Sequence, residues 1–434
     1  MANGEHRHSG AGRRRLTEIF VRGAGGLRPR VPPSPGALEE AARQVLSEEA
    51  WAYLAGGAGL ESTMDRNRRA FEAWQIVPRM LAGIEQVGLE RELFGRRLSA
   101  PLFLSPIGVL ELAHPHADLA VARAAAGLGL PMVFSNQASV AMERCAEQMA
   151  AQPRYFQLYW STSDDLVESL LERAEACGCE ALFLTLDTSM LGWRPRDLDL
   201  ASLPFLRGMG LAQYTSDPTF RRALDAPADA PPHGAPPPKP ALGPGTLATL
   251  FGQIRRYPGS WSEKLSGRPT AAVRRFLATY SRPSLSWQDL AWLRERTRLP
   301  LVLKGILHPD DARRALDHGA DAVMVSNHGG RQVDGSIGAF DALPGIVEAV
   351  AERAPVFFDS GIRGGADIFK ALAVGATAVG LGRPWVYGLA VAGERGVREV
   401  LENLIAELEL TMLLAGCPDL EAVDRSKLRR TEDS

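Results

Sequence analysis

Short apolar runs and amphipathic stretches alternate along most of the chain. Each run is followed by a polar residue and then by a stretch with helical spacing, such as Asp310–His318 or Ala366–Ala373. Alternating strands and helices indicate a parallel sheet. Because there are eight such runs and no strand is left over, we expect an α/β fold built as a single (β/α)8 TIM barrel rather than an open sheet. The predicted strands are Leu102–Leu104, Met132–Phe134, Tyr155–Phe156, Ala181–Leu184, Leu301–Leu303, Ala322–Val325, Val356–Phe358 and Ala378–Leu381.

The regions that flank the predicted barrel, residues 99–417, have their own patterns. Residues 1–36 are rich in Gly, Pro and Arg, which predicts a flexible tail. Residues 37–98 are expected to form an N-terminal helical segment that packs on the barrel, with Ser47 as the N-cap of a short helix. Residues 418–434 are expected to form a C-terminal tail.

One interval breaks the alternation. Between the fourth and fifth predicted strands lie residues 186–300, far more than one helix needs. Residues 196–283 are therefore interpreted as a long loop insertion that acts as a lid. Its stretch 225–245 is almost entirely Ala, Pro, Gly and Asp, which predicts no packed element. On a barrel such an insertion leaves the C-terminal rim, where active sites lie.

Composition narrows the classes of partner. The chain has 434 residues, 45% hydrophobic residues and a formal net charge of −2, so nothing argues for nucleic acid or a membrane surface as a partner. No apolar run is long enough to span a bilayer. The arginines at 13–15 are not followed by an apolar segment, which argues against an export signal. The four cysteines include no zinc-type pair, so we expect a cytoplasmic protein without a metal site.

Polar residues of varied chemistry end the predicted strands. In a barrel these positions converge on one mouth. Turns are polar in any protein, but chance rarely brings together a Lys, a His, two Asp and several neutral hydrogen-bonding groups. The residues are Ser105, Pro106, Ser135, Gln157, Tyr159, Thr185, Asp187, Lys304, Ser326, His328, Asp359, Gly382 and Arg383.

The segment Ser326–Arg331 is the sharpest local feature. His328 follows a strand, the two glycines after it allow close approach of a ligand, and Arg331 offers a bidentate fork for a carboxylate or phosphate. A lone histidine here would more often be an ordinary turn residue. The company of Asp187, Tyr159 and Lys304 favours a functional site.

Two glycine-rich segments follow the seventh and eighth strands. Residues 359–365 read DSGIRGG and residues 380–383 read GLGR. Barrels commonly bind a phosphate at these two loops through backbone N–H groups. Each segment alone is also typical of an ordinary glycine turn, but two consecutive copies, each with an arginine, favour a phosphate site.

With these residues identified, the sequence resembles the FMN-dependent L-2-hydroxy acid oxidase/dehydrogenase family, from about Ala37 to Cys417. The most specific motif is SNHGGRQ at 326–332. It is supported by FQLY at 156–159, LTLDT at 184–188 and LKG at 303–305. Within the family, residues 191–220 and 409–417 are most similar to lactate 2-monooxygenases.

The resemblance implies the cofactor FMN and a role for each matching residue. His328 would be the catalytic base, oriented by Asp187, and Lys304 would stabilise reduced flavin. The substrate would be held by Tyr53, Tyr159, Arg194 and Arg331, with Tyr159 also counted among the catalytic residues. The implied FMN contacts are Pro106, Ile107, Gly108, Ser135, Gln157, Thr185, Lys304, Ser326, Asp359, Ser360, Gly361, Ile362, Arg363, Gly382 and Arg383.

Two positions depart from the family pattern and bear on the reaction. Ser360 stands where many members have Gly, and Gly108 stands where many have Ala. Gly108 and the insertion favour a lactate 2-monooxygenase, which converts L-lactate and O2 to acetate, CO2 and water. The alternatives are an L-lactate or other L-2-hydroxy acid oxidase or dehydrogenase that releases the 2-oxo acid, and a non-catalytic flavin-binding barrel. The family also implies a homo-oligomer, a tetramer or octamer.

Overall fold

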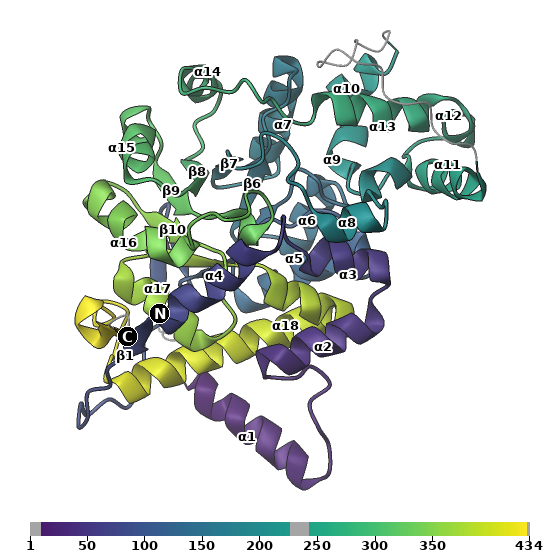
Figure 1. Cartoon of the computed structure of the whole chain (residues 1–434). Helices are drawn as coiled ribbons and strands as arrows, with labels where there is room; N and C mark the ends of the chain where they lie inside the picture. The colour runs from purple at the N-terminus through teal and green to yellow at the C-terminus, as the bar shows by residue number, and fades with distance from the viewer. Residues whose placement is uncertain (1–9, 226–242, 432–434) are drawn as a thin grey trace.

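The centre of the molecule is a closed barrel of eight parallel strands, which confirms the predicted TIM barrel (Figure 1). The structure is a computed structural model that describes residues 10–225 and 243–431. Neighbouring strands follow the order β10-β11-β4-β5-β6-β7-β8-β9 around the barrel. The strands are β4 (Leu102–Leu104), β5 (Met132–Phe134), β6 (Arg154–Leu158), β7 (Leu182–Thr185), β8 (Leu301–Ile306), β9 (Ala322–Val325), β10 (Val356–Phe358) and β11 (Ala378–Leu381).

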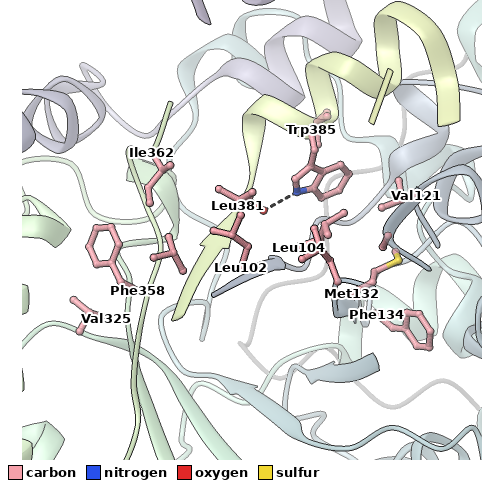
Figure 2. Close-up of a cluster of buried hydrophobic side chains, with 14 of the residues drawn as sticks. Leu102, Leu104, Val121, Met132, Phe134, Val325, Phe358, Ile362, Leu381 and Trp385 are labelled. Atoms are coloured by element: carbon pink, nitrogen blue, oxygen red, sulfur yellow. Dashed lines mark hydrogen bonds between the residues drawn. The ribbon is translucent and has the colours of Figure 1, made fainter. Parts of the chain in front are cut away.

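Successive residues of each strand face opposite sides of the barrel wall. Leu102 and Leu104 pack outward in the layer between strands and helices, where Figure 2 shows them near Trp385, whose indole N–H donates to the Leu381 carbonyl oxygen at 2.6 Å. Phe103 lies between them in sequence and points into the barrel, since it meets side chains from distant strands, Phe183 of β7 and Phe357 of β10. Each strand thus supplies both layers of the core.

The barrel is surrounded by the helices that follow its strands. Helix α18 is the longest and has non-helical backbone at Ala392 and Gly393, where it kinks. The other connections are single helices, except after β7. The helices are α5 (Ala117–Leu128), α6 (Met142–Met149), α7 (Asp164–Ala176), α14 (Asp289–Arg296), α15 (Pro309–Asp317), α16 (Ala339–Val350), α17 (Gly365–Val374) and α18 (Arg383–Ala415).

The N-terminal segment contains helix α1 (Ala11–Ala24), which corrects the expectation of a flexible tail over residues 1–36. Its first turn is held by Glu409 of α18, whose carboxylate accepts hydrogen bonds from the backbone N–H groups of Gly10 and Gly12. Arg15 donates to Asn403 of α18 at 2.7 Å. These partners lie almost 400 residues away, so no local pattern announces the helix.

The predicted helical segment over 37–98 is present and continues into two small sheets. Helix α2 (Pro35–Val45) precedes α3 (Glu48–Ala55), whose first turn is capped by Ser47, as predicted. Helix α4 (Ser62–Glu72) follows. The hairpin of β2 (Arg91–Leu93) and β3 (Arg96–Leu98) lies under the amino end of the barrel, where Phe94 packs edge-on against Tyr155 and Phe357.

The C-terminal residues are also ordered up to residue 431, which corrects the expectation of a tail over 418–434. After the short 3-10 helix η4 (Arg425–Lys427), strand β12 (Leu428–Arg430) pairs antiparallel with β1 (Trp74–Ile76). The Arg425 guanidinium lies 4.1 Å from the centre of the Trp74 ring. A cation over an aromatic face is favourable, and it fixes this end to the N-terminal segment.

The insertion after β7 folds as a cluster of short helices with an aromatic core, in which Tyr214 packs against both Phe220 and Phe276. The predicted unstructured stretch 225–245 falls mostly on residues 226–242, which lie outside the described residues. Within the described ranges, no helix has the length and apolarity that crossing a membrane requires. The elements are α8 (Pro195–Asp199), η2 (Pro204–Arg207), α9 (Ala212–Thr215), α10 (Pro218–Ala223), α11 (Pro244–Arg256), α12 (Trp261–Leu265) and α13 (Arg268–Thr279).

Candidate active site

A cavity opens at the carboxyl end of the barrel, with about 1130 Å³ of empty volume including the solvent at its opening. Most residues predicted for substrate and cofactor line it. Gln157, Thr185, Asp187 and Ser326 are not among its lining residues. The predicted residues in the wall are Tyr53, Pro106, Ile107, Gly108, Ser135, Tyr159, Arg194, Lys304, His328, Arg331, Asp359, Ser360, Gly361, Ile362, Arg363, Gly382 and Arg383.

The floor of the cavity follows from the strand periodicity. Two residues beyond each inward apolar side chain, the next inward position is polar or Gly, as in Phe103 and Ser105 or Phe357 and Asp359. The same spacing places the whole polar layer on one level. It consists of Ser105, Ser135, Gln157, Thr185, Lys304, Ser326, Asp359 and Gly380.

Lys304 is the central charge of this floor. Its ammonium donates to Ser326 Oγ at 2.8 Å and lies 3.6 Å from Asp359 Oδ2 and 3.8 Å from Asp187 Oδ2. Ser105 donates to the same Asp359 oxygen at 3.1 Å. Because the Lys304 side chain is only 4% exposed, these contacts are what keep its charge inside the protein.

Parts of the floor lack hydrogen-bond partners. The side-chain oxygen of Gln157 accepts from Ser135 Oγ at 3.3 Å and from the Asn136 backbone N–H at 3.0 Å, but its amide nitrogen has no partner among the described residues. The same holds for the Thr185 hydroxyl. Thr185 lines a smaller neighbouring cavity rather than the main one. Buried polar groups without partners are rare, so these two indicate that a bound group completes the floor.

His328 and Asp187 form the acid–base pair that the sequence predicted to be close. His328 Nδ1 lies 2.8 Å from Asp187 Oδ1 and donates to it, while Nε2 has no hydrogen bond to the described residues, on a ring that lines the cavity. Burial lowers the pKa of His328, and the Asp187 charge opposes this without reversing it. Burial raises the pKa of Asp187, but the His328 and Lys304 charges outweigh it and hold that pKa at about 2. The pair is therefore a neutral base beside an ionised carboxylate at neutral pH.

The backbone holds His328 in an uncommon conformation, with φ at +57° in the left-handed region. Several hydrogen bonds maintain it: the His328 N–H donates to Ser326 Oγ at 3.1 Å, and the Gly329 N–H donates to Ser360 Oγ at 3.1 Å. Asn327 exchanges side-chain hydrogen bonds with Asn67 of α4, at 2.6 and 2.8 Å. Asn67 was not predicted, because nothing in its local sequence connects α4 with a turn 260 residues away.

A buried arginine, Arg194, a half-buried arginine, Arg331, and a tyrosine lie in the same wall as His328. Arg331 donates to the carbonyl oxygens of Tyr53 and Gly56, at 2.5 and 2.9 Å, and its guanidinium lies over the Tyr53 ring. Burial lowers the pKa of Arg331 to about 9, and Arg194 adds to this effect. Arg194 is itself only 6% exposed. Across the described part of the chain, neither arginine has an ion pair, so this corner favours an anion.

A second site for an anion lies where the loop after β10 meets the start of α18. Arg383 donates to the carbonyl oxygens of Gly329 and Gly56, both at 2.9 Å, while its Nε is buried without a partner in the described structure. Burial lowers its pKa to about 10. Gly361 has φ of +90°, and a Cβ there would lie 2.7 Å from the Asn67 carbonyl oxygen, so this loop requires Gly.

These features fit FMN. A phosphate would neutralise Arg383 at the N-terminus of α18, and the polar edge of a flavin ring would supply the partners that Gln157 and Thr185 lack. Gly380 allows the floor to pack closely, since a Cβ there would lie 2.3 Å from Ser105 Oγ. Among residues 10–225 and 243–431, no cluster of metal-ligating side chains occurs.

The structure adds lining residues that the sequence did not single out for the site. Thr188 reaches both Asp187 and His328, and Gln137 lies against Gly108. Phe205 and Tyr280 come from the insertion, and only its folding back over the mouth brings them to the wall. Thr188 is the last residue of the LTLDT motif at 184–188, and this motif was the available signal. The insertion residues had none.

Known proteins match this chain over nearly its whole length. The family model described as FMN-dependent dehydrogenase matches residues 42–430. An FMN-dependent alpha-hydroxy acid dehydrogenase of Penicillium citrinum, qulF, is 40% identical over 93% of this chain and 92% of its own. An L-lactate oxidase of Lysinibacillus sphaericus is 38% identical over 89% of this chain and 90% of its own.

Solved structures agree. The chain is 33% identical to the lactate oxidase of Pediococcus acidilactici, with a TM-score of 0.74 over 92% of this chain and 94% of that one. A mandelate oxidase with (S)-4-hydroxymandelic acid is 36% identical, again with a TM-score of 0.74, over 92% of this chain and 98% of that one. Together with the cavity, the neutral base and the two anion sites, these matches show that the chain belongs to the FMN-dependent dehydrogenase family of 2-hydroxy acid oxidases and dehydrogenases.

Proposed function

We propose that this enzyme oxidises L-lactate with O2 and retains the product long enough to convert it to acetate, CO2 and water. The observation that carries the oxidation is one cavity in which His328 faces two arginines and Tyr53. A base and an anion site on the same wall suit a substrate with a hydroxyl one carbon from a carboxylate. His328, Asp187 and the arginines are the residues to which we assign the chemistry.

Substrate binding begins at the carboxylate. Arg331 and Arg194 would share its charge, which removes the electrostatic cost of burying both guanidinium groups. The Tyr53 hydroxyl, which lies close to both arginines, would donate a further hydrogen bond. A carboxylate held in this way presents C2 and its hydroxyl to His328, and this fixed orientation favours reaction.

Proton transfer is the task of His328. Its Nε2 accepts a proton from the bound 2-hydroxy acid, and the ionised Asp187 at Nδ1 stabilises the imidazolium that results. FMN supplies the acceptor for two electrons, and the buried Lys304 charge favours the negative charge that reduction adds. Tyr159, which is 8% exposed in the same wall, contributes a neutral hydroxyl, since burial raises its pKa.

Retention of the product is supported by the tight fit at Gly108 and by the insertion. A Cβ on Gly108 would lie 2.9 Å from both Cβ and O of Gln137. Phe205 and Tyr280 of the insertion, with Leu191 just before it, form part of the cavity wall. Oxidation of lactate by O2 gives pyruvate and hydrogen peroxide. If both stay enclosed, peroxide attacks the 2-oxo carbon, the bond from C1 to C2 breaks, and acetate, CO2 and water form with atoms in balance.

A second candidate is an oxidase that releases pyruvate and peroxide. It is favoured by the names of two relatives, L-lactate oxidases that are 38% and 40% identical to this chain. The two candidates share every step up to the oxidised product. They differ only in whether the 2-oxo acid leaves before peroxide reacts with it.

Product analysis distinguishes them. The enzyme is given limiting L-lactate in air with excess catalase, which destroys any released peroxide before it reacts with pyruvate in solution. Our proposal predicts acetate and CO2, with equal moles of O2 and lactate consumed. Pyruvate without CO2, and half as much O2 because catalase returns the other half, would reject retention and leave the oxidase. Gly108→Ala serves as the comparison variant, because a methyl group pressed against Gln137 should shift product toward pyruvate.

Two further predictions concern the protein in the cell. We propose a cytoplasmic location and, from the family resemblance, a homo-oligomer. Size-exclusion chromatography with light scattering tests the second directly, and a monomeric mass would reject it.

A further inference from the structure

Thr188 lies where the acid–base pair meets the substrate wall. Its hydroxyl donates to Asp187 Oδ1 at 2.9 Å and lies 3.3 Å from His328 Nδ1. The residue is 5% exposed and lines the main cavity. Its side chain therefore contacts both members of the pair from the substrate side, and the roles assigned above do not use it.

The two contacts at Asp187 use the same carboxylate oxygen. Thr188 has a single hydroxyl proton and donates it to Asp187 Oδ1. His328 donates to the same oxygen at 2.8 Å. Tyr159 lines the same cavity beside them.

We infer that Thr188 is a positioning residue for the reaction: its hydroxyl fixes the Asp187 carboxylate toward His328. This inference rests on the proposed function of His328 as the base. Asp187 Oδ2 has no hydrogen bond within the described structure and lies 3.8 Å from Lys304, so little else restrains rotation of the carboxylate. Thr188 and His328 both donate to Oδ1 and together hold it.

The hydroxyl also bears on the charge of the pair. The charged groups around His328 are Asp187 after β7, Lys304 of β8 and Arg194 before α8, and Tyr159 after β6 lines the same cavity. Thr188 donates to the oxygen that accepts from His328, so it stabilises the carboxylate charge and weakens its attraction for the His328 proton. Removing the hydroxyl should therefore raise the pKa of His328.

The test compares Thr188→Val, which keeps the shape and removes the hydroxyl, with Thr188→Ser, which keeps the hydroxyl. Anaerobic reduction of bound FMN by L-lactate is followed by stopped flow from pH 5 to 9. A hydrogen bond to a charged group contributes about 1.5 kcal/mol or more, so we expect Thr188→Val to slow the limiting rate about 10-fold. The pH at which this rate falls on the acid side, its acid limb, should move to a higher value in Thr188→Val. Thr188→Ser should restore both the rate and the limb.

The matched control is Ser189→Ala. Ser189 is the next residue, is exposed, and contributes a carbonyl oxygen that accepts from Ser281 at 3.0 Å. It should behave as the unaltered enzyme. A Thr188→Val variant with the unaltered rate and acid limb would overturn the inference, and so would failure of Thr188→Ser to restore them. If the unaltered enzyme itself is not reduced by any L-2-hydroxy acid, the proposed function fails instead, so the two failures are distinct.

Discussion

The amino-terminal and carboxyl-terminal halves of the barrel interior come from the same strands, but one is lined by apolar side chains and the other by polar ones. The amino-terminal half is filled with aromatic rings, where Phe183 stacks between Tyr155 and Phe357 at centroid distances of 5.4 and 6.0 Å. Two residues further along the strands, the carboxyl half carries Lys304, Asp359 and other polar side chains around a cavity. The change from apolar to polar inward side chains therefore occurs within two residues, which is the side-chain repeat of a strand.

The comparison shows how one barrel separates stability from chemistry. In the amino half, Phe183 and its neighbours are fully buried and Phe94 closes the end. In the carboxyl half, Gln157 and Thr185 carry unpaired polar atoms, and His328 has a positive φ. Such features cost folding free energy, and they persist because the aromatic half and the bound cofactor offset that cost.

The largest stability effect should come from Phe183→Ala. Removing a buried Phe costs about 3–5 kcal/mol of unfolding free energy. Because the polar layer above is held by its own hydrogen bonds, turnover per bound FMN should stay within about twofold. Urea unfolding of the FMN-saturated protein measures the loss of unfolding free energy, and Phe251→Ala, at an exposed position, is the control. A loss of activity larger than the loss of folded protein would show that the two halves are not separable.

Removal of FMN should weaken the carboxyl half alone. FMN at about 100 times its dissociation constant should add about 2.7 kcal/mol to stability by mass action. In the apoprotein, hydrogen exchange should therefore speed up in the loops after β10 and β11, around Gly361 and Arg383, while β7 stays protected. Equal loss of protection in both halves would contradict the comparison.

Arg331→Lys should damage the substrate site with little effect on stability. Lysine cannot offer the paired donors of a guanidinium, and loss of about 1.5–3 kcal/mol predicts a fall in kcat/KM of about 10–100-fold. The effect should fall mainly on KM, since the His328–Asp187 pair is untouched. Arg207→Lys on η2 is the control, because Arg207 is 43% exposed and pairs with Glu49 at the surface. A variant with unchanged KM would remove Arg331 from carboxylate binding.

The smallest effect is a pH dependence. His328 must be neutral to accept a proton, and its folded-state pKa lies below 6.5, so kcat/KM should be flat at neutral pH and fall only below 6.5. Asp187 titrates near 2 and should not contribute in that range. Asp187→Asn removes the charge that raises the pKa of His328, so the acid limb should move to still lower pH while the rate falls. If the acid limb of Asp187→Asn moved to higher pH, the assignment of Asp187 as the group that raises the pKa of His328 would be contradicted.

The sequence predicted the parts of the structure that follow from the alternation of apolar and amphipathic stretches and from the polar residues at the strand ends. The alternation of apolar runs located all eight strands, and the polar residues that end them, from Ser105 to Arg383, gather at one mouth. The pairing of His328 with Asp187 was predicted from the resemblance and is present at 2.8 Å. These features are local, or depend only on the regular geometry of a barrel.

What the sequence did not predict depends on distant contacts. Helix α1 is stabilised by Glu409, and β12 exists because it pairs with β1. Asn67 supports the His328 turn from α4. Phe205 and Tyr280 reach the cavity only through the packing of the insertion. In each case the partner is far along the chain, so no local pattern of polar and apolar residues carries the information.

The most direct test of the account is anaerobic reduction of bound FMN by L-lactate and other L-2-hydroxy acids, with the unaltered enzyme beside His328→Gln. General-base catalysis contributes at least about 100-fold, so bleaching of the flavin by the variant should be slower by that factor or more, with FMN still bound. Reduction of His328→Gln at a rate near that of the unaltered enzyme would contradict the assignment of His328 as the base.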